Sequence, residues 1–303
     1  MNEFELTILG CGSARPSVRH LPSAQVLSYR GKLFMIDCGE GAQREFFRYG
    51  FNLNRVGHIF ISHLHGDHCY GLIGFISTLI LQGKTGELTI HAHNDLEKLL
   101  APSLEYFCRS EVFRVIFSPL PVKGGIIYED KSLQVTAFPL KHRVPSYGFR
   151  FDEKEKLPHI DKSAAEYYQI PLKELQAIKE GADYITPEGE TIPNKKLVLP
   201  PSPSQSYAYC SDTIYTPRIV PFVKGVTVLY HESTYTEEYS EQAKDRYHST
   251  AAQAADIARQ AEVGTLILGH YSSRYKDEAQ FLNEARPIFP NTLLSNEGMK
   301  FRF

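Results

Sequence analysis

Short apolar runs rich in β-branched residues recur along most of the chain, and each predicts a strand. Residues 4–10 predict a strand that ends in a glycine-rich turn, and the two apolar runs on either side of Arg30 and Gly31 predict a hairpin. Similar runs predict further strands at residues 58–62, 87–92, 113–120, 133–142, 206–212, 225–233, 265–270 and 299–303.

Helical patterns lie between these runs. Gly50 is expected to end the first helix, Asn94 to cap the third, and Ser249 or Thr250 to lie near the cap of an alanine-rich fourth. The predicted helices span residues 40–50, 69–83, 94–107, 249–263 and 276–289. Because strands and helices alternate in both halves, with hairpins among them, we expect an α/β (α+β layered) fold with mixed sheets.

Residues 152–194 differ from the rest of the chain. They are polar, carry prolines at positions 158, 171, 187 and 193, and show little strand periodicity. We therefore expect an inserted arm with a short helix near residues 171–181. The whole chain, residues 1–303, is expected to form a single domain around this insertion.

Composition narrows the class of protein. The 303 residues carry a net charge of −2, with a sequence pI near 6.6, so any nucleic-acid phosphates must be met by a local patch or by metal ions. The five cysteines include no C-x-x-C pair, which argues against a disulfide framework and indicates a reducing compartment. The sequence shows neither a signal-peptide pattern nor a run of eighteen apolar residues, so we expect a cytoplasmic protein without a membrane partner.

Metal chemistry is indicated by the segment ISHLHGDHCYG, residues 61–71, directly after a predicted buried strand. His63 and His65 are two positions apart, so in an extended segment their side chains share a face. Gly66 is expected to let the backbone turn sharply before Asp67 and His68. A single loop histidine is usually solvated, but four such residues in H-x-H-x-D-H predict a metal centre.

Other predicted strands end in further metal-binding residue types. His142, Asp212 and His270 each lie just past an apolar run, where α/β folds place their sites. We expect one metal to be held by His63, His65 and His142, a second by Asp67, His68 and His270, and Asp212 to bridge them. The ligand types favour two Zn²⁺ ions per chain, although Mn²⁺ would also suit them. Two ions about 3.5–4 Å apart can activate a water and hold both the attacked group and its leaving oxygen.

The HLHGDH motif with the later histidines and aspartate resembles the metallo-β-lactamase superfamily. That resemblance implies an αββα sandwich with the metals at one edge. It leaves the substrate open, because members of the superfamily cut amides, thioesters, sulfates and phosphodiesters.

Two further segments, HEST at residues 231–234 and YHST at 247–250, narrow the chemistry. Glu232 could simply end a strand at the surface and His248 begin a helix. Beside a metal centre, however, the two residues are better interpreted as an acid dyad. Cutting a phosphodiester requires a proton for the departing alkoxide, and His248 can supply it if Glu232 orients it and keeps it charged.

These segments, taken in order with CSDT and LGHYSSRY, resemble the ribonuclease Z family. The similarity covers nearly the whole chain and includes LGCGSARP, FMIDCGEGAQREF and ISHLHGDHCYGLIGFISTL. It implies an endoribonuclease that removes the 3′ trailer of precursor tRNA, leaves a 3′-hydroxyl and works as a homodimer. It also implies that Asp67 accepts the proton of the attacking water, and that the inserted arm is a tRNA exosite.

RNA contacts are expected from exposed cations. The planar guanidinium of Arg274 suits a contact with phosphate. In the ribonuclease Z family the loop after SARP usually reads P-x-K-R-N, and in this sequence only Arg19 keeps a basic side chain there. In the arm, acidic residues outnumber lysines, so we expect weakened tRNA binding through Lys173 and Lys179. We also expect Asp37 to orient a metal-bound histidine.

Two alternatives remain at this stage. A metal-dependent phosphodiesterase acting on small or generic phosphodiesters would use the same metals and dyad, but would not need the arm. A tRNA-binding or metal-storing protein without turnover would not need His248 and Glu232.

Overall fold

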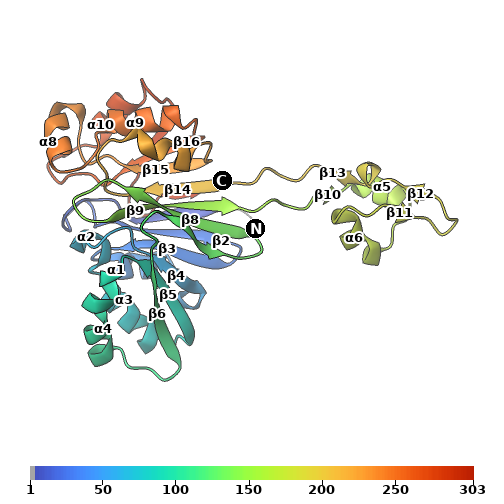
Figure 1. The fold of residues 1–303 in the computed structure, drawn as a ribbon, viewed down its shortest axis with the longest axis horizontal. Helices are drawn as coiled ribbons and strands as arrows, with labels where there is room; N and C mark the ends of the chain where they lie inside the picture. Colours follow the sequence, from blue (N-terminus) through green and yellow to red (C-terminus); the bar gives the residue numbers. More distant parts are fainter. Residues whose placement is uncertain (1–3) are drawn as a thin grey trace. The chain divides into compact units, whose positions relative to one another are not determined.

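The computed structural model describes residues 4–303, which fold as two compact units (Figure 1). The larger unit comprises the described residues up to Glu129, residues 134–151 and residues 205–303. The smaller unit comprises residues 130–133 and 152–204. All the predicted metal ligands belong to the larger unit.

The first sheet of the larger unit has seven strands within residues 4–303, in the order β18-β1-β2-β3-β4-β5-β6. Antiparallel pairing joins β18, β1, β2 and β3, and parallel pairing joins β3 to β6. Its strands are β1 (Glu5–Gly10), β2 (Ala24–Tyr29), β3 (Lys32–Cys38), β4 (Val56–Phe60), β5 (Gly86–Ala92), β6 (Phe113–Pro119) and β18 (Lys300–Arg302). The predicted hairpin is confirmed: Arg30 and Gly31 have positive φ values of 47° and 80°, as a two-residue turn between right-twisted strands requires.

The second sheet also has seven strands in the described chain, in the order β17-β16-β15-β14-β9-β8-β7. Strands β14 to β17 are parallel, and β7 and β8 are antiparallel. Its strands are β7 (Gly125–Glu129), β8 (Leu133–Leu140), β9 (Ser146–Glu153), β14 (Ser206–Cys210), β15 (Val228–Glu232), β16 (Thr265–Gly269) and β17 (Thr292–Leu294).

Helices cover the outer faces of the two sheets, which gives the expected αββα layering (Figure 1). On the first sheet lie α1 (Ala42–Arg48), α2 (Gly66–Cys69), α3 (Leu72–Leu81) and α4 (Asp95–Phe107). With the second sheet are α7 (Val220–Val223), α8 (Ser240–Asp245), α9 (Ala251–Gln260) and α10 (Ala279–Ala285). Thr250 caps α9 through a capping box with Gln253, as predicted, whereas Asn94 makes no capping hydrogen bond through its side chain.

Aromatic rings fill the space between the inner faces of the sheets. The ring of Phe60 on β4 lies 5.5 Å from that of Phe149 and 5.4 Å from that of Phe151, both on β9. All three side chains are fully buried. This core holds the two sheets together, so loops that leave their strands at one edge of the sandwich are brought side by side.

The smaller unit has its own small core. Its elements are β10 (His159–Ile160), α5 (Lys162–Tyr167), α6 (Leu175–Lys179), β11 (Tyr184–Ile185), β12 (Thr191–Ile192) and β13 (Val198–Leu199). Buried apolar side chains pack together in it: Ile170, Ile178, Tyr184, Ile192 and Leu197. The predicted short helix near residues 171–181 corresponds to α6.

None of the helices within residues 4–303 combines the length and the apolar character needed to cross a bilayer.

Candidate metal centre

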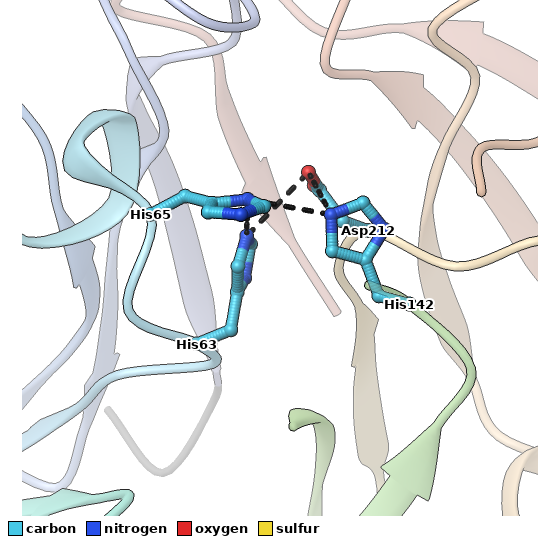
Figure 2. A group of neighbouring side chains, drawn as sticks. All are labelled: His63, His65, His142 and Asp212. Carbon is cyan, nitrogen blue, oxygen red and sulfur yellow. Dashed lines mark hydrogen bonds and ion pairs between the residues drawn. The ribbon is translucent and has the colours of Figure 1, made fainter. Parts of the chain in front are cut away.

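The predicted ligands lie at one edge of the sandwich because each follows the carboxyl end of a strand. The HLHGDH segment follows β4 and runs into α2, His142 follows β8, Asp212 follows β14, and His270 follows β16. Figure 2 shows His63, His65, His142 and Asp212 with their polar atoms directed toward one another.

The first ligand set is compact. His63 Nε2 lies 3.0 Å from His65 Nδ1, and His142 Nε2 lies 3.3 Å from the same atom. Oδ2 of Asp212 is 3.6 Å from His63 Nε2 and 3.8 Å from His142 Nε2. Atoms about 2.1 Å from a tetrahedral zinc ion would lie about 3.4 Å from one another, so these four atoms fit one ion.

The second set has the same spacing. His68 Nε2 lies 3.6 Å from Asp67 Oδ2 and 3.4 Å from Asp212 Oδ1. His270 Nε2 lies 3.5 Å from Asp67 Oδ2 and 3.2 Å from Asp212 Oδ1. Asp212 therefore directs one carboxylate oxygen to each set, which is the arrangement of a bridging ligand.

Orphaned polar atoms in the second set also fit a metal ion. Nε2 of His68, Oδ1 of Asp212 and Nε2 of His270 are buried and have no hydrogen-bond partner. Leaving a buried polar atom unpaired costs about 1–3 kcal/mol, so three at one point indicate that a cation belongs there. The chain's own residues thus fit the metals that the motif predicts.

Hydrogen bonds at Nδ1 orient three of the candidate ligand rings, those of His68, His142 and His270. His68 Nδ1 donates to Asp37 at 2.7 Å, and His270 Nδ1 donates to the Thr234 hydroxyl at 2.8 Å. His142 Nδ1 donates to the Tyr247 carbonyl at 2.8 Å. With Nδ1 protonated and engaged, the lone pair of Nε2 is directed to the ligand position.

Asp37 is a buried hub behind the centre, consistent with the orienting role expected for it. Besides His68, its carboxylate accepts the Ser62 backbone N–H at 2.7 Å, the Ser62 hydroxyl at 2.9 Å and the Tyr209 hydroxyl at 2.7 Å. Among the non-glycine residues at the site, Asp37, Tyr247 and His270 have φ near +60°. Such costly backbone conformations cluster where the fold must aim particular groups.

Electrostatics favour a cation at the centre. Burial lowers the pKa of His63, His65 and His142, which keeps these rings in the neutral form that binds metals. Burial alone would also lower the pKa of His68, but the carboxylates of Asp67 and other neighbours outweigh it and raise the pKa. Positive charge is therefore stabilised beside His68.

The dyad residues meet beside both ligand sets. His248 Nδ1 lies 3.0 Å from Glu232 Oε1, and the ring of His248 lies 5.1 Å from that of His142 and 5.5 Å from that of His270. Burial alone would lower the pKa of His248, but the Glu232 carboxylate outweighs it and raises the pKa to about 9. The imidazole is thus held in its charged form, with Nε2 left to give a proton.

The backbone around Asp67 differs from the expectation for Gly66. Gly66 is the first residue of α2 and does not form a sharp turn; a Cβ there would lie 2.2 Å from the ring of Tyr70. A side chain at position 66 would therefore displace the exposed ring of Tyr70. Asp67 Oδ2 accepts the backbone N–H of Ala14 at 2.6 Å, a contact that the sequence did not indicate.

The expected RNA contacts lie outside the centre. Arg274 is exposed, with its guanidinium carbon 4.3 Å from the ring centroid of Tyr239. Arg19 is bonded to the Lys276 carbonyl and to Glu278. Lys173 and Lys179 are in the smaller unit, where Lys173 is 80% exposed and lies 3.8 Å from Glu174. RNA binding by these four side chains remains a prediction.

Three supporting groups had no role assigned from the sequence. The Tyr247 carbonyl and the Ala14 N–H are backbone groups, which leave no residue-type signal. Thr234 lies in the HEST segment, and its hydroxyl donates to Glu232 at 2.7 Å while accepting from His270. Because Thr234 lies two residues after Glu232, a contact between its hydroxyl and that carboxylate could have been predicted from the sequence.

Comparison with known proteins gives the family. A protein-family model described as "Anti-Pycsar protein Apyc1" matches residues 4–168, more than half of the chain. Ribonuclease Z of Bacteroides thetaiotaomicron is 52% identical over 300 residues, which cover 99% of this chain and 95% of that protein.

Solved structures agree on the fold. The short form of human tRNase Z superimposes with a TM-score of 0.72 at 24% identity, covering 98% of both chains. A metallo-β-lactamase fold protein from Bacillus subtilis superimposes with a TM-score of 0.70 at 17% identity, covering 99% of this chain and 100% of that one. The predicted metallo-β-lactamase fold is thereby confirmed. Residues 4–168 belong to the family of the Apyc1 model, and over its full length the chain belongs to the ribonuclease Z family.

Proposed function

We propose that this protein is a metal-dependent endoribonuclease that removes the 3′ trailer of precursor tRNA and leaves a 3′-hydroxyl. The observation that carries the proposal is the shared carboxylate of Asp212, with Oδ2 facing one ligand set and Oδ1 the other. Beside it lies a charged histidine, His248, that can protonate a leaving group. Together they match the needs of phosphodiester hydrolysis.

The proposed cofactors are two Zn²⁺ ions per chain. One would be held by His63, His65, His142 and Asp212, and the other by Asp67, His68, His270 and Asp212. When bound, the ions supply Lewis-acid stabilisation of the phosphate charge and lower the pKa of a water. Mn²⁺ suits the same oxygen and nitrogen donors.

The chain's own residues have separate tasks in this proposal. Asp67 is a ligand that accepts a proton from the attacking water; His68 and His270 hold its pKa low against the effect of burial, so it is ionised and ready. His248 gives the proton that the departing ribose oxygen requires. Glu232 orients His248 and keeps it charged.

The substrate assignment is supported by the family. The full-length relatives are named ribonuclease Z, and a similar fold is found in a protein named tRNase Z. In this proposal the smaller unit, within which residues 152–194 were predicted to be an inserted arm, contacts tRNA away from the cut. The working form is a homodimer in the cytoplasm.

A second candidate is hydrolysis of small phosphodiesters. It is favoured by one observation: every ligand and both dyad residues come from the larger unit, so the chemistry does not draw on the smaller one. A small ester would then be cut by the same groups without an RNA-binding arm.

The deciding experiment is cleavage of a precursor tRNA with mapped 3′ ends, before and after metal removal and with Zn²⁺ or Mn²⁺ restored. We expect a single cut at the 3′ end of the mature domain, lost on chelation and recovered with metal. Metal-dependent turnover of bis(p-nitrophenyl) phosphate without any cut in the precursor would favour the second candidate. No turnover of either would contradict both.

A further inference from the structure

The segment between β1 and β2 contacts the metal centre through its backbone. Ala14 has φ of 64°, and its N–H donates to Asp67 Oδ2 at 2.6 Å. Ser13 donates its own N–H to the Tyr271 carbonyl at 3.0 Å, next to the ligand His270. The position of Asp67 therefore depends on how residues 13–20 are held.

The other end of this segment is anchored by His20. Its Nδ1 lies 2.9 Å from Glu297 Oε2, and its Nε2 lies 3.1 Å from Glu278 Oε1. His20 is only 8% exposed. A ring with a carboxylate on each nitrogen must donate from both, and only the imidazolium has two N–H groups. The geometry thus requires a charged histidine between two glutamates.

The other charged and titratable groups around the His20 ring are compatible with a charged imidazole. Arg19 pairs with the other oxygen of Glu278 at 2.5 Å, and the Cys11 thiol lies 3.4 Å from His20 Nδ1. The Tyr271 ring lies 5.7 Å from the imidazole. Burial alone would lower the pKa of His20, but Glu297 and then Glu278 outweigh it and raise the pKa.

We propose that His20 is a positioning residue: its imidazolium, clamped between Glu278 and Glu297, fixes residues 13–20 so that the Ala14 N–H holds Asp67 in place. The inference rests on the proposed function, because it concerns the carboxylate that would bind metal and accept the proton. The segment is tied at one end by Tyr271 and at the other by this clamp. Neutralising His20 would loosen the second anchor.

The same atoms invite a second interpretation, a third metal held by Cys11, His20 and Glu297. Hydrogen bonding argues against it. Glu297 Oε1 accepts the Leu21 N–H at 2.9 Å, and both nitrogens of His20 are paired. At the main centre, by contrast, ligand atoms of His68 and His270 are buried without partners.

The sign of the pH effect follows from the raised pKa. Below the unfolded value of about 6.5, His20 is protonated in both the folded and unfolded chains, so the clamp contributes its full stability. As the pH rises through the raised folded pKa, the charge and the contribution are lost. A neutral replacement such as glutamine has no such dependence.

The test compares wild type with His20→Gln, both purified with their metals. We expect kcat on precursor tRNA to fall about 10–100-fold in the variant, with KM nearly unchanged, and the affinity for one metal ion to fall by a similar factor. Glu278→Gln should shift both quantities in the same direction but less, because Glu297 still holds the ring. His93→Gln, at a histidine of the larger unit whose ring pairs with Asp95, is the matched control and should match wild type.

A second readout is thermal stability across pH 5.5–9.5. The difference between wild type and His20→Gln should be greatest near pH 6 and shrink as the pH rises. A constant difference with unchanged kcat would mean that His20 only packs, and would overturn the proposal. So would a third equivalent of metal that disappears in Cys11→Ser. If wild type itself does not cut precursor tRNA, the proposed function fails, yet the pH-dependent stability and the metal affinity still test the clamp.

Discussion

The Nδ1 atom of His248 lies 3.0 Å from Oε1 of Glu232, a carboxylate that is completely buried. The same oxygen accepts the backbone N–H groups of Thr213 and Ser249 at 3.1 and 3.0 Å. Backbone donors therefore hold Glu232 in one position, and Glu232 in turn holds His248. The sheet itself thus orients the proposed proton donor, since Glu232 is the last residue of β15.

His248→Ala should leave the metal content unchanged and slow cleavage of precursor tRNA by about 10²–10⁴-fold, the range typical of a general acid. The reason is that the side chain is not needed for either ligand set but stands beside both. Metal analysis of the purified variant, together with single-turnover rates, checks this. Loss of one ion would show that His248 is a ligand.

Glu232→Gln should reduce both activity and stability. An amide offers one acceptor oxygen where the carboxylate has two, and the other oxygen, Oε2, accepts the backbone N–H and the hydroxyl of Thr234. Leaving such buried donors poorly paired costs about 1–3 kcal/mol.

Urea unfolding of Glu232→Gln, compared with the exposed Glu241→Gln as a control, measures the loss of stability. If the two variants are equally stable and only Glu232→Gln cleaves precursor tRNA slowly, then Glu232 acts on catalysis through His248 and does not stabilise the fold.

Much of the fold was predictable because hydrophobic runs of five or more residues mark buried strands. Three strands of the larger unit were missed, each for a physical reason. β17 has three residues, and β7 lies at the edge of its sheet with only half-buried or exposed side chains. β9 ends inside the polar segment that was predicted to begin the arm, and its apolar part was not recognised as a strand.

The clustering of the candidate ligands was predictable for a different reason: polar residues directly after buried strands have few structural uses, and they meet at one sheet edge. What supports them was harder to predict. The Tyr247 carbonyl holds His142, and the Ala14 N–H holds Asp67, yet any residue carries these backbone groups. Their use depends on left-handed φ values of 59° and 64°, which neither side chain signals.

Asp212→Ala should cost the protein both metal ions, whereas a change in any other ligand should weaken one ion more than the other. The reason is that Oδ2 serves the His63 set and Oδ1 the His68 set. Metal content by elemental analysis after dialysis checks this, with Asp67→Ala as the one-site comparison and the exposed Asp245→Ala as control.

Asp67→Ala should also abolish cleavage while the thermal transition of the sheet core is retained. Retention of one tightly held ion in Asp212→Ala would contradict the bridging role. Near-wild-type turnover in Asp67→Ala would contradict its assignment as ligand and proton acceptor.

The smaller unit allows a test of substrate size. Its buried residues, such as Ile178 and Tyr184, pack among themselves, and none of its residues is a predicted metal ligand. Lys162 and Lys179 line one groove of about 780 Å³, so two of its lysines share a surface, although Glu166 lies on it too. This partial segregation suits weak phosphate binding.

Replacing residues 154–202 by a short glycine-serine linker should therefore raise KM for precursor tRNA and leave turnover of bis(p-nitrophenyl) phosphate nearly unchanged. Lys173→Ala with Lys179→Ala should raise KM in the same direction but less, with a loss that grows as salt is lowered, because each phosphate contact adds to the salt dependence. Lys224→Ala, an exposed lysine of the larger unit, is the control. Equal loss on both substrates would mean that the unit supports the fold or the dimer, and no loss on either would remove it from substrate binding.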